Sequence, residues 1–348
     1  MDNFDEYLRQ EEPNKAEKAN FWKTAIGLQK IDGLTPSDYL IETAKQNIDG
    51  DITIEEVKQR IENYYNQQHT SQINEDRTEE ADKVSARITE MLGEQSFTFS
   101  PTEYLNIHRR LFKGIYEFAG KIREYNITKQ EWVLNGETVL YGSAGSLKET
   151  LEYDIEQEKK FIYNGLSQQE IIQHISRFIS YFWQIHVFGE GNTRTTAIFL
   201  IKYLRKLGFK EANNDLFAEN SWFFRNALVR ANYEDISKGV YKTEEYLFRF
   251  VSNLIGNGNY ILKNREMHVQ YLDPVKAKND LVNDPVKKTI LNHLQHKPTA
   301  NYAELAEKIG YSISTIKRHI QELKKLGLIK RIGSDKTGYW NINLSNKS

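Results

Sequence analysis

Four polar side chains of different chemistry stand close together in the chain, at His186, Glu190, Asn192 and Arg194. An imidazole is a base that is neutral near pH 7, a carboxylate can hold a hard cation, and a guanidinium pairs with phosphate oxygens. The amide of Asn192 adds a further polar group beside them. Together these residue types favour phosphoryl or nucleotidyl transfer over a simpler binding task.

Two predicted helices must position these groups. Apolar residues recur at helical spacing before His186 and after Thr193, so one helix should end and the next begin near these positions. Gly189 and Gly191 lie between them and let backbone N–H groups turn toward one point, where the second helix presents unpaired amides and the positive end of its dipole. The junction is therefore a predicted anion-binding site.

The junction resembles the signature of the Fic (filamentation induced by cAMP) family, His-x-Phe-x-(Asp/Glu)-Gly-Asn-(Gly/Lys)-Arg-x-x-Arg. The matching core covers residues 79–251, and residues 116–127, Tyr-Glu-Phe-Ala-Gly-Lys-Ile-Arg-Glu-Tyr-Asn-Ile, look like the family segment that leads into its substrate-docking flap. The signature positions that match are His186, Phe188, Glu190, Gly191, Asn192 and Arg194.

This resemblance implies a transferase that moves AMP from ATP to a Tyr, Ser or Thr hydroxyl of a target protein. His186 would take the proton of the attacking hydroxyl, and Glu190 would hold the cofactor Mg²⁺ against the α- and β-phosphates. Phe188 would be a buried plug that fixes the loop. The residues that would bind the nucleotide are Gly189, Gly191, Asn192, Thr193 and Arg194.

Two positions depart from the signature. Thr193 stands where the family has Gly or Lys, a modest change because its backbone N–H remains. Ala197 stands where the family has a second arginine that binds the γ-phosphate, and the loss of such a charge-assisted bond costs about 1.5–3 kcal/mol. Arg225 and Arg230 are candidate substitutes, the alternative being that both lie on a solvated helix face.

Ala197 leaves three functions open. The first is protein adenylyltransferase activity on a target protein. The second is transcriptional regulation by a DNA-binding protein whose Fic core only binds a nucleotide. The third is transfer of another phosphate-linked group. The remaining alternative is that this segment holds no functional site, and that His186 has only a structural role beside an ordinary glycine loop.

Residues 125–142 are expected to form a β-hairpin, because β-branched and aromatic residues flank the turn signal Asn135-Gly136. An exposed strand edge near the junction would dock a target segment by main-chain pairing. The alternative is an ordinary packed hairpin with Trp132 in the core. The predicted docking residues of this flap are Ile127, Thr128 and Lys129.

The first 65 residues resemble the small antitoxin that accompanies some Fic enzymes, on the basis of residues 28–34 and 49–57. In that family a helix carries (Ser/Thr)-x-x-x-Glu-(Gly/Asn), and its Glu pairs with the second signature arginine and blocks productive ATP. Here Asp32-Gly33 occupies the Glu-Gly position and is the predicted inhibitory pair, with Leu28 at the Ser/Thr position. Residues 71–75 match the same spacing. The alternative is a unit that only packs.

Positive charge gathers in the last part of the chain. From Pro285 onward ten Lys and two Arg face four acids, a net charge of +8, which leaves −9 for the preceding 284 residues. This split suggests that the tail meets a polyanion. Three predicted helices and a hairpin follow one another there and resemble a winged helix-turn-helix.

The third of these helices is predicted over residues 312–326, with a polar and basic face that suits major-groove entry. Its apolar residues Ile313, Ile316, Ile320 and Leu323 should be buried, and His319 should lie outside. The alternative is a winged helix that binds protein. The predicted DNA-binding residues are Thr315, Lys317, Arg318, Lys330 and Arg331.

Composition sets the remaining limits. The chain has no cysteine, which excludes disulfides, Cys-ligated zinc, iron–sulfur clusters and thiol catalysis. It has neither a signal-like start nor a long uncharged stretch, so we expect a cytoplasmic protein with no membrane partner.

The expected fold is mainly α, a Fic-type helical core with a small β-hairpin flap, an N-terminal helical unit and a C-terminal winged helix-turn-helix. The expected partners are ATP, a target protein and DNA, and the oligomeric state, a homo-oligomer included, is left open. The expected domains are an inhibitory unit at 1–75, a catalytic core at 76–265, a linker at 266–283 and the winged helix at 284–348.

Overall fold

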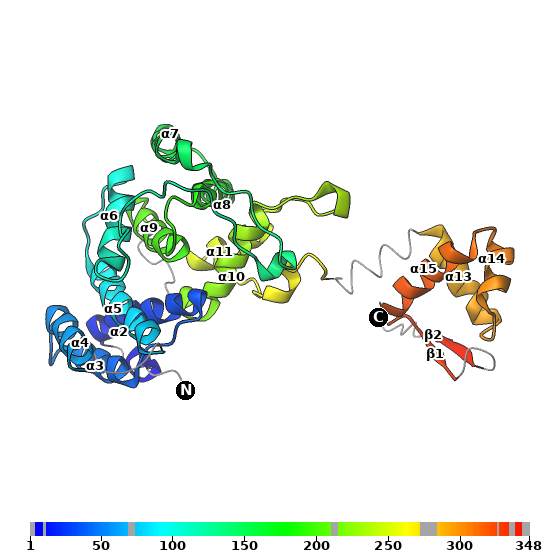
Figure 1. The fold of residues 1–348 in the computed structure, drawn as a ribbon, viewed down its shortest axis with the longest axis horizontal. Coiled ribbons are helices and arrows are strands. Elements are labelled where there is room, and N and C mark those ends of the chain that lie inside the picture. The colour runs from blue at the N-terminus through cyan, green and yellow to red at the C-terminus, as the bar shows by residue number, and fades with distance from the viewer. Residues whose placement is uncertain are drawn as a thin grey trace. The chain divides into compact units, whose positions relative to one another are not determined.

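The computed structural model of the chain describes residues 4–9, 12–68, 74–209, 215–271, 284–325, 327–333 and 338–342. The fold is mainly α-helical, as predicted, and the chain divides into two compact units, Met1–Val269 and Gln270–Ser348 (Figure 1). None of the described helices is both long and apolar enough to cross a bilayer.

The first unit opens with α1 (Asp5–Arg9), α2 (Pro13–Gln29), the 3₁₀ turn η1 (Lys30–Asp32), α3 (Asp38–Asp49) and α4 (Ile54–Gln68). Ser37 caps α3, because its hydroxyl accepts the N–H of Leu40 at 3.0 Å. Helix α4 continues through Gln68 and α5 starts at Asn74, while 69–73 lie outside the described residues.

The remaining helices of this unit carry and surround the predicted junction. Helix α8 begins with a capping box, in which Ser167 and Glu170 bond reciprocally to each other's backbone. The elements are α5 (Asn74–Gly93), α6 (Pro101–Phe112), η2 (Trp132–Leu134), η3 (Ala144–Ser146), α7 (Leu147–Lys160), α8 (Gln168–Ile185), α9 (Asn192–Lys206), α10 (Asp215–Ala231), η4 (Ile236–Lys238), α11 (Glu245–Leu254) and η5 (Asn264–Met267).

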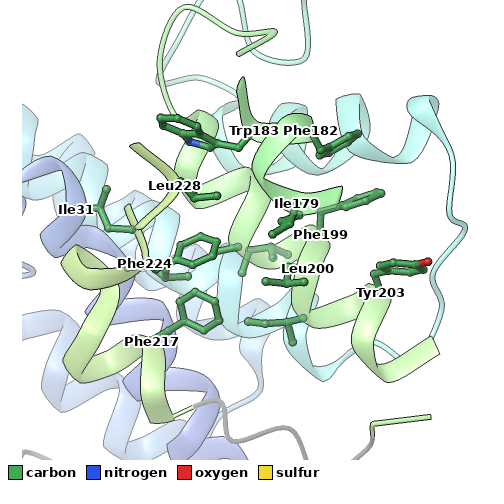
Figure 2. Packing of buried hydrophobic residues seen from close by; sticks show 14 of the residues in the cluster. Ile31, Ile179, Phe182, Trp183, Phe199, Leu200, Tyr203, Phe217, Phe224 and Leu228 are labelled. Atoms are coloured by element: carbon green, nitrogen blue, oxygen red, sulfur yellow. The ribbon is translucent and has the colours of Figure 1, made fainter. Parts of the chain in front are cut away.

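Helix α9 lies at the centre of the core, and every residue from Asn192 to Leu204 is buried. Figure 2 shows Phe182 of α8 beside Phe199 of α9, whose rings stack with centroids 5.1 Å apart. Phe217 and Phe224 of α10 pack against the same core, their own centroids 5.1 Å apart. Helix α9 is thereby fixed along its length, which fixes the loop that precedes it.

The N-terminal helix α2 packs directly against α10. A Cβ atom added to Gly27 would lie 2.3 Å from the Cα of Ala218, so only glycine allows this backbone approach. The hydroxyl of Ser221 donates to the carbonyl of Gly27 at 2.8 Å. The end of α2 and η1 are thus held beside α10, and Ile31 is buried in the core of the unit (Figure 2).

The β-hairpin predicted over residues 125–142 is wrong in its secondary structure. The chain does reverse at Asn135-Gly136, where the N–H of Glu131 donates to the carbonyl of Glu137 at 2.9 Å, but η2 occupies the turn and no strand is present in this segment. Trp132 is 55% exposed, so the alternative with Trp132 in the core is also wrong. The flap is an irregular loop.

The second unit has the predicted order of three helices and a hairpin. Ile290, Leu305, Ile320 and Trp340 belong to its separate apolar core. The elements are α13 (Pro285–His296), α14 (Tyr302–Ile309), α15 (Ile313–Lys325) and the antiparallel strands β1 (Ile329–Ile332) and β2 (Tyr339–Ile342), with Ile329 opposite Ile342.

Candidate functional site

The candidate active site is the junction between α8 and α9. His186 follows the last residue of α8 in the left-handed conformation (φ 52°), and Gly191 precedes α9 with φ 76°. A non-glycine residue with positive φ is uncommon and costs free energy, and such strain is concentrated at functional sites. His186 and Asn135 are the non-glycine residues that adopt it in the described part of the chain.

The start of α9 presents unpaired amides. The N–H of Thr195 donates to the carbonyl of Gly191 at 3.0 Å, whereas among the described residues the N–H groups of Asn192, Thr193 and Arg194 meet no acceptor. Unpaired amides at a helix start, with the positive end of the helix dipole, form an anion-binding site. The structure therefore has unpaired amides at the place where the sequence predicts an anion-binding site, and the binding itself stays a prediction.

His186 is buried, with 3% of its surface exposed, but it lines a narrow cavity at the junction. Its ring packs 4.2 Å from that of Tyr141, and Nδ1 has no hydrogen-bond partner among the described residues. Burial, and then the positive charges of Lys129 and Arg225, hold the pKa of His186 well below its ordinary value. The imidazole is therefore neutral near pH 7 and can accept a proton.

Asn192 holds the loop in shape. Its Oδ1 accepts the N–H of Phe188 at 3.0 Å, and its Nδ2 donates to the carbonyl of Phe188 at 2.7 Å. Phe188 is fully buried, as expected of a plug. Since both polar atoms of the Asn192 side chain are engaged, the group that this residue presents to an anion in this structure is its backbone N–H.

His108 of α6 supports the same loop, and sequence reasoning missed it. Its Nδ1 accepts the N–H of Gly120 at 2.8 Å, so Nε2 carries the proton and donates to the carbonyl of Glu190 at 3.0 Å. Its ring stacks on Phe188 with centroids 3.6 Å apart. Burial lowers the pKa of His108 to about 4. No motif marks this residue, because its role depends on a contact between distant segments.

Glu190, the predicted metal ligand, pairs with the flap. Its Oε2 lies 2.8 Å from Nζ of Lys129, and its side chain is 54% exposed. Of the predicted docking residues, Lys129 therefore reaches the junction, while Ile127 packs against the core and Thr128 is exposed.

The guanidinium of Arg194 is enclosed, with 1% of the residue exposed. Nε lies 2.7 Å from Oδ2 of Asp32, Nη1 donates to Gln29 at 2.9 Å, and Nη2 donates to Glu80 at 2.6 Å. Two of these three partners belong to the N-terminal helices. Gly33 follows Asp32 with φ 69° and ends η1, so it sets the turn and contributes no side chain.

Asp32 also faces a second arginine. Its Oδ1 lies 3.7 Å from Nη1 of Arg225, whose Nε and Nη2 donate to the buried carboxylate of Glu131 at 3.1 to 3.4 Å. Arg230 donates instead to the carbonyl of Tyr241. Of the two candidate substitutes for the missing arginine, Arg225 faces the junction.

An inner cavity and an outer groove meet beside Asp32 and Arg225. The inner cavity has a volume of about 10 Å³, roughly the room for one water molecule. An outer groove of about 510 Å³ is lined partly by Gly33, Arg77, Tyr116 and Trp222. The residues that line both are Asp32, Lys129, Glu190 and Arg225, so two oppositely charged pairs stand between the groove and the histidine.

Arg123 fixes the flap, and it too was missed by sequence reasoning. Its guanidinium donates to the carbonyls of His186 at 2.8 Å, Tyr125 at 2.5 Å and Gly142 at 2.6 Å. One buried side chain thus ties both ends of the flap to the loop between α8 and α9, and this explains how the segment is held without a strand ladder.

In the second unit, the predicted DNA-binding residues differ in exposure. Lys317, Arg318 and Lys330 are exposed, whereas Thr315 and Arg331 are half-buried. Two predictions for α15 are wrong. Ile313 is 46% exposed because it begins the helix, and the side chain of His319 is largely buried, 3.8 Å from Glu322 and 3.9 Å from Asp284.

Comparison with known proteins agrees with both units. Residues 98–204 match the Fic/DOC family, and residues 283–330 match a family described as winged helix-turn-helix DNA-binding. The chain is 29% identical over 103 residues to protein adenylyltransferase VbhT of Bartonella schoenbuchensis, and this alignment covers 30% of the chain and 20% of that relative. The chain therefore contains a Fic/DOC domain followed by a winged helix-turn-helix domain, and its helical N-terminus is consistent with an antitoxin-like unit.

Proposed function

We propose that the first unit is a protein adenylyltransferase, which moves AMP from ATP to a hydroxyl of a target protein. The observation that carries this proposal is the convergence of a neutral buried imidazole and the unpaired amides of α9 on one cavity. A base and an anion cradle at one point suit an attack by a hydroxyl on a phosphate.

In the proposed reaction, His186 accepts the proton of the target hydroxyl as its oxygen attacks the α-phosphorus. The new oxygen–phosphorus bond replaces the bond to the β-phosphate, and pyrophosphate leaves. The amides of Asn192 to Arg194 would stabilise the negative charge on the phosphate oxygens. The Arg194 guanidinium would do so once its N-terminal partners have withdrawn.

The residues at the junction fit Mg²⁺ held mainly by the nucleotide. Glu190 offers an accessible carboxylate, and no group of three or more metal-binding side chains occurs in the described ranges. Magnesium bound with substrate phosphates commonly takes one or two carboxylates and several waters, and it neutralises phosphate charge. Glu190 would hold the ion, and for this Lys129 would have to release the Glu190 carboxylate.

We further propose that the N-terminal helices restrain this activity. Asp32 pairs with Arg194, and the cavity beside His186 has room for little more than one water. The site as described is therefore closed to a triphosphate. Asp32 would thereby have the inhibitory role that the sequence suggested, with the first arginine of the signature as its partner and not a second one.

Labelled ATP tests the activity. Full-length Asp32→Ala protein would be incubated with Mg²⁺ and ATP labelled at either the α- or the γ-phosphate, with and without added cell extract as a source of targets. Protein should retain the α-label, and His186→Ala in the same background should abolish this. The exposed His296→Ala is the matched control. Retention of the γ-label, or none of the α-label, would refute adenylyl transfer.

Ala197 favours testing other donors in the same assay. Because the usual cation for the terminal phosphate is absent, UTP, GTP and CDP-choline should be compared with ATP. If one of these donors reacts and ATP does not, the transferred group is another phosphate-linked group and not AMP. His186 would remain the proposed base.

We propose that the second unit binds double-stranded DNA. Its family match and the exposed Lys317, Arg318 and Lys330 support this. If nucleotide changes DNA binding and no label is ever transferred, the protein is better explained as a regulator whose Fic core senses a nucleotide.

A further inference from the structure

An isoleucine lies exposed at the start of α15, the third helix of the second unit. Ile313 is the first residue of this helix and is 46% exposed. Helical spacing groups it with Ile316, Ile320 and Leu323, but only those three belong to the apolar core of the unit. Helix side chains lean toward the N-terminus, so this first residue leans away from the turns that face the core. Its apolar surface is therefore left to water.

The side chains beside Ile313 on this helix are polar and basic. Ser314 follows it, and Lys317 and Arg318 lie one turn further along, all three exposed. Residues four apart are neighbours on a helix surface, so Lys317 stands next to Ile313. Nζ of Lys317 lies 5.7 Å from the centre of the Tyr302 ring, which favours this position of the ammonium. Ile313 is thus an apolar side chain beside groups of the kind that bind phosphates.

This combination suits DNA better than a protein partner. The buried centre of a protein interface is depleted of charged residues, so one isoleucine next to exposed cations fits such an interface poorly. DNA offers phosphates to the cations, and its major groove carries one apolar group, the C5-methyl of thymine. The match of residues 283–330 to a winged helix-turn-helix DNA-binding family agrees with this choice. In helix-turn-helix proteins the first residues of the recognition helix contact base edges.

We propose that Ile313 contacts the C5-methyl group of a thymine in the major groove of double-stranded DNA. The second unit then prefers a T·A pair at one position of its site. This inference rests on the proposed DNA binding and names the residue and the base that select one sequence over another. The cations bind phosphates of any sequence, whereas Ile313 distinguishes bases. Uracil pairs as thymine does and lacks only the methyl group, so exchanging the two isolates this contact.

Selection from a random pool of DNA duplexes with the full-length protein gives the preferred sequence. Each thymine of that sequence is then replaced in turn by deoxyuridine, and affinity is measured by fluorescence anisotropy at one salt concentration. Wild type should bind about fourfold more weakly when the contacted thymine loses its methyl group, the effect of one buried methyl. Ile313→Ala should bind the thymine duplex more weakly than wild type does, with no further loss for deoxyuridine. Ile313→Val should keep part of the preference.

Ile332→Ala is the matched control, because Ile332 is also exposed, at 37%, but belongs to β1. This variant should keep the fourfold preference for the methyl group. Since Ile313 lies outside the apolar core, Ile313→Ala should fold normally, which thermal unfolding checks. Equal sensitivity of wild type and Ile313→Ala to the methyl group, no sensitive thymine, or no enriched sequence would overturn the role of Ile313 and leave DNA binding standing. Absence of any DNA binding would overturn the proposed function of the second unit as well.

Discussion

Asp32 places a single carboxylate between two guanidiniums, and these two arginines come from α9 and α10. It reaches Arg194 at 2.7 Å and Arg225 at 3.7 Å, and both arginines keep further acidic partners, Glu80 and Glu131. Removing Asp32 therefore leaves no unpaired buried cation. The protein should fold normally without this side chain, so a substitution of Asp32 tests its effect on the site separately from folding.

We predict that Asp32→Ala raises the rate of α-label transfer by about tenfold or more. The reason is that the Asp32 carboxylate, whose interaction with Arg194 contributes about 1.5 kcal/mol or more, no longer competes with the nucleotide for this arginine. The rate would be measured from label incorporation over time at a fixed ATP concentration. Asp38→Ala is the control, an exposed aspartate of the same N-terminal helices. An equal rate in wild type and Asp32→Ala would mean that this contact restrains nothing.

His108 predicts a pH dependence of stability. Its pKa is about 4 in the folded protein, below the ordinary value of about 6.5, so the unfolded chain binds this proton more readily. The contribution is complete above about pH 6.5 and is lost as the pH falls toward 4, at about 2 kcal/mol between pH 6.5 and 5. Urea unfolding at both pH values should show this decrease, and His108→Gln should show less. An equal decrease in both proteins would exclude His108 as its source.

Residues with a fixed motif spacing could be chosen from the sequence. His186, Glu190 and Arg194 lie together at the junction, and Asp32 was placed by the spacing of an inhibitory motif. His108, Arg123 and Glu80 were missed, because each acts through a contact with a segment far away in the chain. A single sequence contains no signal for such pairings.

At the scale of elements, the position of Asp32 depends on the contact between α2 and α10. Gly27 lets the two backbones touch at Ala218, and the hydroxyl of Ser221 bonds to the carbonyl of Gly27. Because η1 follows α2 directly, any displacement of α2 from α10 moves the carboxylate away from both arginines.

We predict that Gly27→Ala weakens the restraint on the site. The added Cβ would lie 2.3 Å from a backbone atom of α10, so α2 must shift. We expect a lower melting temperature together with faster α-label transfer than wild type. Gly93→Ala is the control, since its Cβ would meet Phe21 at 3.9 Å, an ordinary contact. A lower melting temperature with an unchanged rate would separate packing of α2 from control of the site.

The flap shows why an element was predicted wrongly. Asn135-Gly136 between β-branched residues is typical of a hairpin, and the chain does turn there. In the structure, Arg123 takes the carbonyls of Tyr125 and Gly142, at the two ends where a ladder would continue. Hydrogen bonds from the buried Arg123 guanidinium therefore take the place of strand pairing in this segment. Local β-propensity does not include such a contact.

At the scale of the whole molecule, the positive charge of the second unit predicts salt-dependent DNA binding. Removing one cation that neutralises a DNA phosphate should reduce the slope of log affinity against log salt by about 0.9. Lys317→Ala, Arg318→Ala and Lys330→Ala should each do so in fluorescence anisotropy titrations with a DNA duplex. Lys148→Ala, a highly exposed lysine of the first unit, should leave the slope unchanged. Unchanged slopes in the three variants of the second unit, as in the Lys148→Ala control, would exclude DNA binding through Lys317, Arg318 and Lys330.

The order of elements was largely predictable, because helical periodicity and caps are local properties. His186 and Gly191 mark helix ends close to where the sequence placed them. The packing of α2 on α10 was not predictable, since it depends on the shape of two surfaces far apart in sequence. A candidate site at the junction could be chosen from one segment, whereas the pairing of Asp32 with both Arg194 and Arg225 required the fold.

The carboxylate of Asp32 and the junction that we propose it closes belong to one polypeptide. Asp32 therefore acts at an effective concentration set by the fold, and diluting the protein cannot remove it. An inhibitor on a separate chain would dissociate when its supply falls. In this protein the resting activity per molecule should be the same at every expression level, and relief must come from an event that pulls η1 from α9.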